Sequence, residues 1–378
     1  MAGIYIHIPF CKQACNYCNF HFSTSLQNKD ALLQAMLIEI NLTAIQPSFN
    51  TAQVINTIYF GGGTPSILFS NDIVMLLAAI QSKFIISPTV EITLEANPDD
   101  ITLQKLIEWK AIGINRLSVG IQSFNEDELV WMNRAHTAKE SLQCIDIIQQ
   151  AGFTNYSIDL IYGSPLLNNQ VWKKNVQIVI DKKVPHISCY ALTVEPKTLL
   201  YKQISQQKKL AIDTDKQAEQ FLLLMNWMEA YGYQHYEISN YCLPGFESKH
   251  NSSYWQHEPY FAFGPAAHSF DGKSRKWNIA NNALYITALQ NGTIPFEAEV
   301  LTPAEQLNEY IMTALRTKKG LSLLYIQNNF GEDKVAAILL KVTKWINCNK
   351  AIIANNNIVL TRQGKLFADG IAVDFFEG

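Results

Sequence analysis

Three cysteines near the start of the chain are its clearest candidates for chemistry. Cys11, Cys15 and Cys18 are separated by four and three positions, so their thiolates can converge on one inorganic centre. A structural zinc site would need a fourth ligand to complete its tetrahedron, and His21 is the nearest candidate. A [4Fe–4S] cluster can be held by three cysteines when something else ligates its fourth iron. We favour the iron–sulfur cluster, with the zinc site as the alternative.

The other four cysteines are scattered singly along the chain. An odd total of seven in a chain of this length is not the pattern of a disulfide framework. We therefore expect Cys144, Cys189, Cys242 and Cys348 to be small buried hydrophobic residues. Cys242 could also act as a soft metal ligand, but a buried thiol is the preferred interpretation.

Strand-like and helical segments alternate through the first two thirds of the chain. Such repeated βα units predict a parallel sheet with helices packed outside it. The expected strands are Gly3–Pro9, Val54–Phe60, Val90–Glu95, Asn115–Gly120, Tyr156–Tyr162 and His186–Leu192, with His235–Ser239 as a further candidate. The expected helices are Lys29–Ile45, Asn71–Phe84, Leu103–Ala111, Lys139–Ala151, Val171–Ile180 and Lys216–Tyr231.

Residues with unusual chemistry lie in or just after these strands. The cysteine loop follows the first strand, Gly61–Gly63 follows the second, and Glu95 ends the third. Gln122 follows the fourth strand, and Asp159 lies in the fifth. In a parallel β/α barrel the carboxyl ends of the strands share one rim, where active sites are built. This placement favours a barrel over an open sheet. The glycines would let backbone approach a ligand closely, although a tight βα turn explains them equally well.

The pattern changes from about Pro295. Helices are expected at Thr302–Leu315, Ser322–Asn329 and Glu332–Ile346, followed by a hairpin and a last helix that begins near Arg362. Three helices and a hairpin resemble a winged helix. Residues 303–378 carry only nine basic against seven acidic side chains, so we expect a packing or lid domain and no nucleic-acid partner.

The composition is that of an ordinary folded protein. The chain has 48% hydrophobic and 17% charged residues and a formal net charge of -3, which disfavours nucleic-acid binding through bulk positive charge. It contains no apolar run of membrane-spanning length. The first ten residues lack a basic segment, and His7 and Pro9 interrupt their apolar stretch, so they are not typical of a signal peptide. We expect a cytoplasmic protein.

Longer motifs carry a resemblance to a known family. Cys11–Cys18 matches the CxxxCxxC signature of radical S-adenosylmethionine (radical SAM) enzymes. Tyr5–Cys11, Phe60–Ser66, Leu117–Asn125 and Ile158–Gly163 are similar to the branch that contains oxygen-independent coproporphyrinogen III oxidases and haem chaperones. The resemblance covers essentially the whole chain. It implies an α/β fold: a partial (β/α)6-type barrel with a small C-terminal winged-helix-like α+β domain.

The resemblance also implies domain limits and cofactors. The barrel core would span residues 1–240, a connecting region 241–294 and the C-terminal domain 295–378. Three cysteines would hold a [4Fe–4S] cluster, and SAM would chelate its open iron. In such enzymes one electron from the cluster cleaves SAM to methionine and a 5′-deoxyadenosyl radical. The positions that match SAM contacts are Tyr5, Tyr17, Gly62, Gly63, Thr64, Glu95, Gln122, Arg134, Asp159 and Ala191.

Plainer interpretations exist for four of these polar positions. Glu95 and Arg134 suit the charged methionine end of SAM, but a surface ion pair would explain them too. Asp159 suits ribose hydroxyls, yet Asp159 and Gln122 could equally form buried structural hydrogen bonds.

Two features separate the oxidases from the chaperones of this branch. The oxidases have a further cysteine two places after the third, where this chain has Phe20, and an N-terminal extension that is absent here. His250–Trp255 instead matches the HNxxYW motif that is implicated in haem binding by the chaperones. His250 could ligate haem iron, and Tyr254 and Trp255 could pack on the porphyrin. The plainer interpretation is a loop-capping histidine and core aromatics.

We therefore expect a haem chaperone that binds a [4Fe–4S] cluster, SAM and haem. Its partners would be haem or porphyrin and haem-accepting proteins, membrane haemoproteins among them. His268, in a nearby loop of the same branch, could face a porphyrin or form a local hydrogen bond. The alternatives are an oxidase that decarboxylates coproporphyrinogen III and a zinc-stabilised scaffold.

Overall fold

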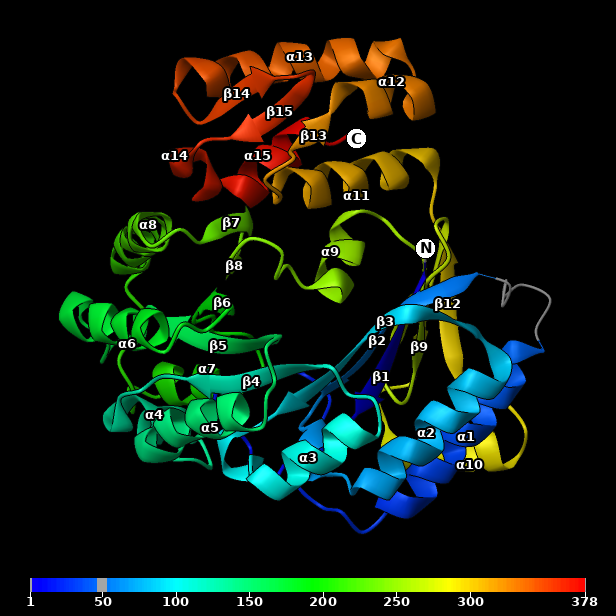
Figure 1. The fold of residues 1–378 in the computed structure, drawn as a ribbon. Helices are drawn as coiled ribbons and strands as arrows, with labels where there is room; N and C mark the ends of the chain where they lie inside the picture. The colour runs from blue at the N-terminus through cyan, green and yellow to red at the C-terminus, as the bar shows by residue number, and fades with distance from the viewer. Residues whose placement is uncertain (1, 46–52, 378) are drawn as a thin grey trace.

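The computed structural model describes residues 2–45 and 53–377. Its centre is a curved sheet in which six parallel strands follow one another in chain order (Figure 1). These strands are β1 (Ala2–Ile8), β2 (Val54–Gly62), β3 (Ile85–Ala96), β4 (Arg116–Gln122), β5 (Tyr156–Tyr162) and β6 (His186–Ala191). The partial β/α barrel expected from the sequence is therefore confirmed. β3 begins five residues before the expected strand.

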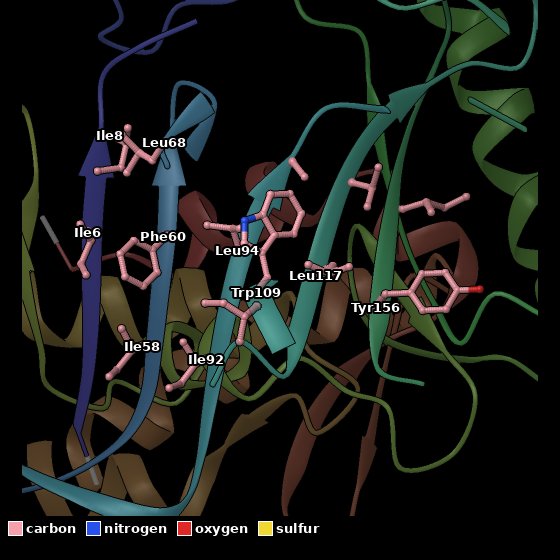
Figure 2. Packing of buried hydrophobic residues seen from close by; sticks show 14 of the residues in the cluster. Ile6, Ile8, Ile58, Phe60, Leu68, Ile92, Leu94, Trp109, Leu117 and Tyr156 are labelled. Carbon is pink, nitrogen blue, oxygen red and sulfur yellow. The ribbon is translucent and has the colours of Figure 1, made fainter. Parts of the chain in front are cut away.

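Helices cover the outside of this sheet (Figure 1). They are α1 (Lys29–Ala44), α2 (Ser70–Lys83), α3 (Leu103–Ala111), α4 (Glu126–Met132), α5 (Ala138–Gln150), α6 (Asn169–Asp181), α7 (Leu199–Ser205) and α8 (Thr214–Ala230). Alternate strand residues point outward and pack against the helices, as Ile6, Ile58, Phe60 and Leu94 do in Figure 2, where Trp109 of α3 lies beside Leu94. Each expected helix is present, and α4 and α7 add two short ones.

The inward-facing residues of the same strands are mostly polar or small. Strand alternation places Tyr5, Tyr59, Glu95, Ser118 and Asp159 opposite the helix-facing residues. A barrel that is filled only for packing has branched apolar side chains in this position. The inner face of this sheet is therefore built for polar contacts.

Further strands extend the sheet at both ends. β7 (Gln234–Glu237) and β8 (Asn240–Cys242) follow β6 in antiparallel order. On the other side β9 (Tyr260–Phe263) pairs in parallel with β1, and β10 (His268–Phe270), β11 (Ser274–Asn278) and β12 (Phe296–Val300) continue from it. α10 (Asn282–Gln290) packs against α1. The short strands β8 to β12, between residues 240 and 300, were not expected from the sequence, whereas β7 agrees with the candidate strand His235–Ser239.

Helix α9 (Lys249–Trp255) carries the HNxxYW motif and lies at the start of the parallel strands. It contacts β1 and β2 on one side and α11 (Pro303–Leu315) of the C-terminal domain on the other. The ring of His250 lies beside Gly3, near the beginning of β1, whereas the cysteine loop follows the end of that strand. The motif and the cysteines are therefore at opposite ends of the barrel.

The C-terminal domain has its own hydrophobic core, which runs from Leu307 to Phe375. It consists of α11, α12 (Leu323–Phe330), α13 (Glu332–Asn347), α14 (Arg362–Lys365) and α15 (Ala368–Phe375) around the strands β13 (Leu321–Ser322), β14 (Ala351–Ala354) and β15 (Asn357–Leu360). The expected helices and hairpin are confirmed. The domain meets the barrel at β7, where Glu237 forms a bridge with Thr317. The domain limits at residues 240 and 295 stay predictions.

Three of the four scattered cysteines are buried, as expected. Cys348 is exposed, so its assignment as a buried hydrophobic residue was wrong: it follows the end of α13, beyond the buried face of that helix. Cys242 is a fully buried thiol. In the part of the chain that the structure describes, every helix is too short or too polar to cross a bilayer.

Candidate functional site

A cavity of about 820 Å³ opens on the inner face of the sheet. The cysteine loop, the ends of β2 to β6, α8 and parts of the C-terminal domain line it. The volume suits a small-molecule or cofactor site. Of the ten residues that match SAM contacts, nine line this cavity: Tyr17, Gly62, Gly63, Thr64, Glu95, Gln122, Arg134, Asp159 and Ala191.

The three clustered cysteines are half-buried at this cavity. The Thr64 hydroxyl donates to Cys11 Sγ at 3.5 Å, and Arg134 Nη1 donates to Cys15 Sγ at 3.2 Å. Burial raises the pKa of Cys18 to about 11 and also raises the pKa of Cys11. Donors aimed at sulfur stabilise thiolates that carry an inorganic centre.

The geometry separates an iron–sulfur cluster from a single zinc ion. Among the described residues, no three His, Cys, Asp or Glu side chains close on one metal position. His21, the fourth zinc ligand considered from the sequence, pairs with Asn282 at 2.7 Å and does not line the cavity. The cysteines of a cluster bind separate irons and need not meet at one point. The donor set therefore fits a [4Fe–4S] cluster better than zinc.

The glycine segment is positioned by backbone contacts between β1 and β2. Gly63 N–H donates to Ile8 O at 2.8 Å, and a Cβ on Gly63 would lie 2.6 Å from Phe10 O. Gly62 has a φ of +107°, in the region that favours glycine. Both residues line the cavity. The tight turn considered from the sequence thus explains why they are glycines, and their backbone still borders the cavity.

Glu95 lies at the end of β3 with its carboxylate in the cavity. The Tyr59 hydroxyl donates to Oε1 at 2.7 Å, and Gly62 N–H donates to Oε2 at 3.1 Å. Burial, with nearby Asp159 adding to it, raises the pKa of Glu95 to about 7. A carboxylate that titrates near neutrality and faces a cavity is typical of a binding or catalytic position.

Arg134 links the cysteine loop to the strand ends. Besides Cys15, its guanidinium donates to Asn97 Oδ1 at 2.8 Å and to Gly120 O at 2.7 Å. Neither Arg134 nor Glu95 forms an ion pair within the described residues, so the surface ion pair considered for them was wrong. Asn97 also donates to Thr64. Asn97 was not among the candidate residues expected from the sequence.

Gln122 and Asp159 both face the cavity. Gln122 has a φ of 65°, unusual for a non-glycine residue, at a register shift between β4 and β5. Burial raises the pKa of Asp159 to about 6, against the Ser188 hydroxyl and the charge of Arg116, which lower it. Both side chains can therefore contact a ligand in the cavity, even if they also form hydrogen bonds within the protein.

Tyr5 is the SAM-matching residue that does not line the cavity. It lies on β1, where its hydroxyl pairs with His7 Nδ1 at 3.3 Å and its ring stacks on Tyr59. Tyr59 in turn donates a hydrogen bond to Glu95, which lines the cavity. Tyr5 therefore supports the cavity wall without bordering the cavity.

His250 is 1% exposed and both ring nitrogens have partners. Nδ1 pairs with Thr57 Oγ1 at 2.8 Å and Nε2 with the Tyr254 hydroxyl at 2.8 Å. The ring also stacks on Tyr59 at 4.9 Å, and burial lowers the pKa of His250 to about 3. In this arrangement the imidazole serves as a buried packing residue, and iron could reach it only after α9 moves.

The other aromatic residues of the region are also engaged. The Tyr254 ring packs edge-on against Tyr260, and Trp255 lies under the guanidinium of Arg316 at 5.6 Å. His268 is exposed on β10, where its ring stacks on Trp277. The HNxxYW motif and the cavity therefore meet through Arg316, which lines the cavity.

The comparison with known proteins agrees with this geometry. A model described as the radical SAM superfamily matches residues 5–177, and one described as the HemN C-terminal domain matches residues 301–367. The chain is 33% identical to the protein named heme chaperone HemW of Bacillus subtilis, over 98% of both chains. The chain belongs to the HemW family.

Other members of this family are similarly related. The HemW of Mycobacterium tuberculosis is 30% identical over 98% of this chain and 93% of its own, and that of Escherichia coli is 31% identical over 70% and 69%. The solved structure of the coproporphyrinogen III oxidase HemN from Escherichia coli superimposes with a TM-score of 0.84. That match covers 99% of this chain and 90% of HemN at 22% identity, so it establishes the radical SAM fold alone.

Proposed function

We propose that this protein is a haem chaperone that carries a [4Fe–4S] cluster on Cys11, Cys15 and Cys18 and binds SAM beside it. It works in the cytoplasm and hands haem to acceptor proteins, membrane haemoproteins among them. The observation that carries the proposal is the likeness to HemW over nearly the whole of both chains. The half-buried cysteines beside a cavity of suitable size support the cofactor part.

The chain's own residues divide the work of holding the cofactors. The cluster, when bound, would supply an electron and an open iron for SAM. Gly62 and Gly63 offer backbone at the cavity wall, and Glu95 offers a carboxylate held by two donors. Asp159 offers a second carboxylate suited to hydroxyl groups. Arg134 and Thr64 hold the sulfur side of the site in place.

Phe20 favours the chaperone over the oxidase. It occupies the position where the oxidases of this branch have a further cysteine, and its ring is 67% exposed at the cavity. A phenyl ring can supply neither a thiol nor a metal ligand.

The decisive assay is anaerobic incubation of cluster-loaded protein with SAM, a strong reductant and coproporphyrinogen III, with the products read by mass. We expect intact substrate while an authentic oxidase, run alongside, converts it. Loss of two carboxyl groups would overturn the chaperone proposal and make this chain an oxidase despite Phe20.

We further propose that His250, Tyr254 and Trp255 contact haem once α9 has moved away from the barrel. His250 would then exchange its two hydrogen bonds for the haem iron. In a haem titration, His250→Ala should lose the spectral signature of histidine ligation. Thr57→Val is the matched control, because it removes one partner of the imidazole and keeps the ligand. If both variants change the spectrum equally, or neither does, His250 is not the ligand.

A further inference from the structure

The C-terminal domain places two cationic side chains in the wall of the cavity. Arg316, just after α11, and Lys365, the last residue of α14, line the same cavity as the cysteine loop. Neither residue belongs to the set that holds the cluster or matches SAM contacts. No sequence motif points to them, since only the packing of the two domains brings them to the cavity.

Lys365 has no carboxylate partner within ion-pair distance in the described chain. Its Nζ donates to His235 Nδ1 at 2.8 Å, and His235 Nε2 pairs with Ile238 O at 3.1 Å. A carbonyl oxygen only accepts, so Nε2 carries the proton and Nδ1 is the acceptor for the ammonium. Two of the three N–H donors of Lys365 therefore remain for something in the cavity.

The environment makes this ammonium costly to bury. Burial, with the charge of Arg362 adding to it, lowers the pKa of Lys365 to about 8. A partly desolvated ammonium beside a neutral imidazole is destabilised in its charged form. A bound anion would offset this desolvation penalty.

Arg316 also has a hydrogen-bond donor without a partner among the described residues. Its Nη1 forms an ion pair with Asp369, an exposed carboxylate that also lines the cavity, while its Nε is buried and has no partner in the described chain. The guanidinium also covers the ring of Trp255 in the HNxxYW motif. Arg316 thus lies where the cavity meets that motif.

The neighbouring charges leave room for an anion. Glu237 is the buried carboxylate whose charge acts on both cations, yet it forms no ion pair with either within 4.0 Å. Its Oε1 accepts from Asn240, and burial raises its pKa. The charges of Arg362 and Lys318 also act on Lys365, but neither residue lines the cavity, and Arg362 already pairs with Glu229.

We infer that Lys365 and Arg316 form a carboxylate-binding subsite that takes a propionate of a porphyrin lying in the cavity. Free N–H donors on two cations match the acceptors of a carboxylate. A propionate at Arg316 would also bring the macrocycle next to Trp255. The inference rests on the proposed haem function and adds the group by which the porphyrin is recognised.

The test compares protoporphyrin IX with its dimethyl ester, binding to the cluster-loaded full chain by fluorescence. These probes lack iron, so axial ligation does not enter. The wild type should bind the diacid about tenfold or more tightly than the ester. Lys365→Met should remove most of this preference, because it weakens the binding of the diacid and leaves the binding of the ester unchanged. Lys365→Arg should keep the preference. Lys341→Met is the matched control, because Lys341 belongs to the same domain but donates to Phe376 O outside the cavity lining.

The outcomes separate this inference from the function on which it rests. Equal binding of acid and ester by the wild type refutes the carboxylate subsite and leaves the haem function standing. Equal weakening of both probes by Lys365→Met assigns the residue to packing and also refutes the subsite. If the wild type binds neither probe nor haem, the haem function fails together with the inference.

Discussion

The two ends of the barrel differ in how their polar residues are used. At the start of the strands, His250 has partners on both ring nitrogens and is sealed under α9. Further along the same strands, the cysteines, Glu95 and Asp159 face a cavity. One sheet therefore has a packed polar end and an open polar end. Cofactor chemistry belongs at the open end, whereas the packed end can bind a ligand only by opening.

The largest expected effect is at the open end. Replacing Cys11, Cys15 or Cys18 by alanine should abolish the cluster, because each holds one of three protein-bound irons. Anaerobically reconstituted wild type should contain about four irons per chain, and the variants close to none. Iron and labile sulfide analysis gives the readout.

The matched control is Cys144→Ala, which truncates a buried thiol away from the cavity. It should retain the full iron content. One zinc and no labile sulfide in the wild type would sink the cluster hypothesis.

The next effect concerns the glycine segment at the open end. Gly63→Ala would drive a Cβ against the carbonyl oxygens of Phe10 and Ile8. We expect a loss of about 3 kcal/mol in the free energy of unfolding, because backbone atoms cannot yield as side chains do. Urea unfolding measures it. A Gly232→Ala control tests a glycine with positive φ and open surroundings, where only backbone strain remains. Equal losses would show that the close strand contact is unimportant.

A pair of truncations compares the two ends directly. His250→Ala removes two hydrogen bonds and a stacked ring from the packed end, and should cost about 2 kcal/mol. Gln122→Ala removes a cavity side chain with no hydrogen bond to the described chain, and should cost less than about 0.5 kcal/mol. Thermal or urea unfolding of both variants suffices. Similar costs would erase the distinction between the packed and the open end.

The last expected effect is a pH dependence at Glu95. Its pKa is raised to about 7 in the folded chain, mainly by burial, from an ordinary value of 4.5. Between pH 4.5 and 7 the Glu95 carboxyl therefore keeps its proton in the folded state, whereas it loses the proton in the unfolded state. This difference stabilises the folded state at low pH, and the stabilisation is lost as the pH rises through 7. The free energy of unfolding of wild type should fall relative to Glu95→Gln by about 2–3 kcal/mol over this range. A pH-independent difference would mean that Glu95 does not titrate there.

The sequence predicted the parts of the molecule that depend on local pattern. Strands such as Tyr156–Tyr162 are bounded by clear turn signals and alternate between helix-facing and cavity-facing residues. The cysteine spacing and the glycine run lie within short segments, so their chemistry could be inferred without the fold. The SAM-matching positions came from the family resemblance, and nine of the ten line one cavity.

The remainder depends on contacts between distant segments. β9 pairs with β1 across more than 250 positions, which no local pattern encodes. The burial of His250 results from Thr57 and Tyr59 on β2, so its motif alone could not distinguish an open ligand from a sealed one. Lys365 reaches the cavity only because the C-terminal domain docks on β7.

The most direct test of the central claim is an anaerobic haem titration of the cluster-loaded chain, followed by transfer to apomyoglobin. We expect saturable binding of one haem per chain, with a shifted Soret band, and release of that haem to the acceptor. A linear, unsaturable absorbance increase, or haem that is never released, would contradict the assignment of this protein as a haem chaperone.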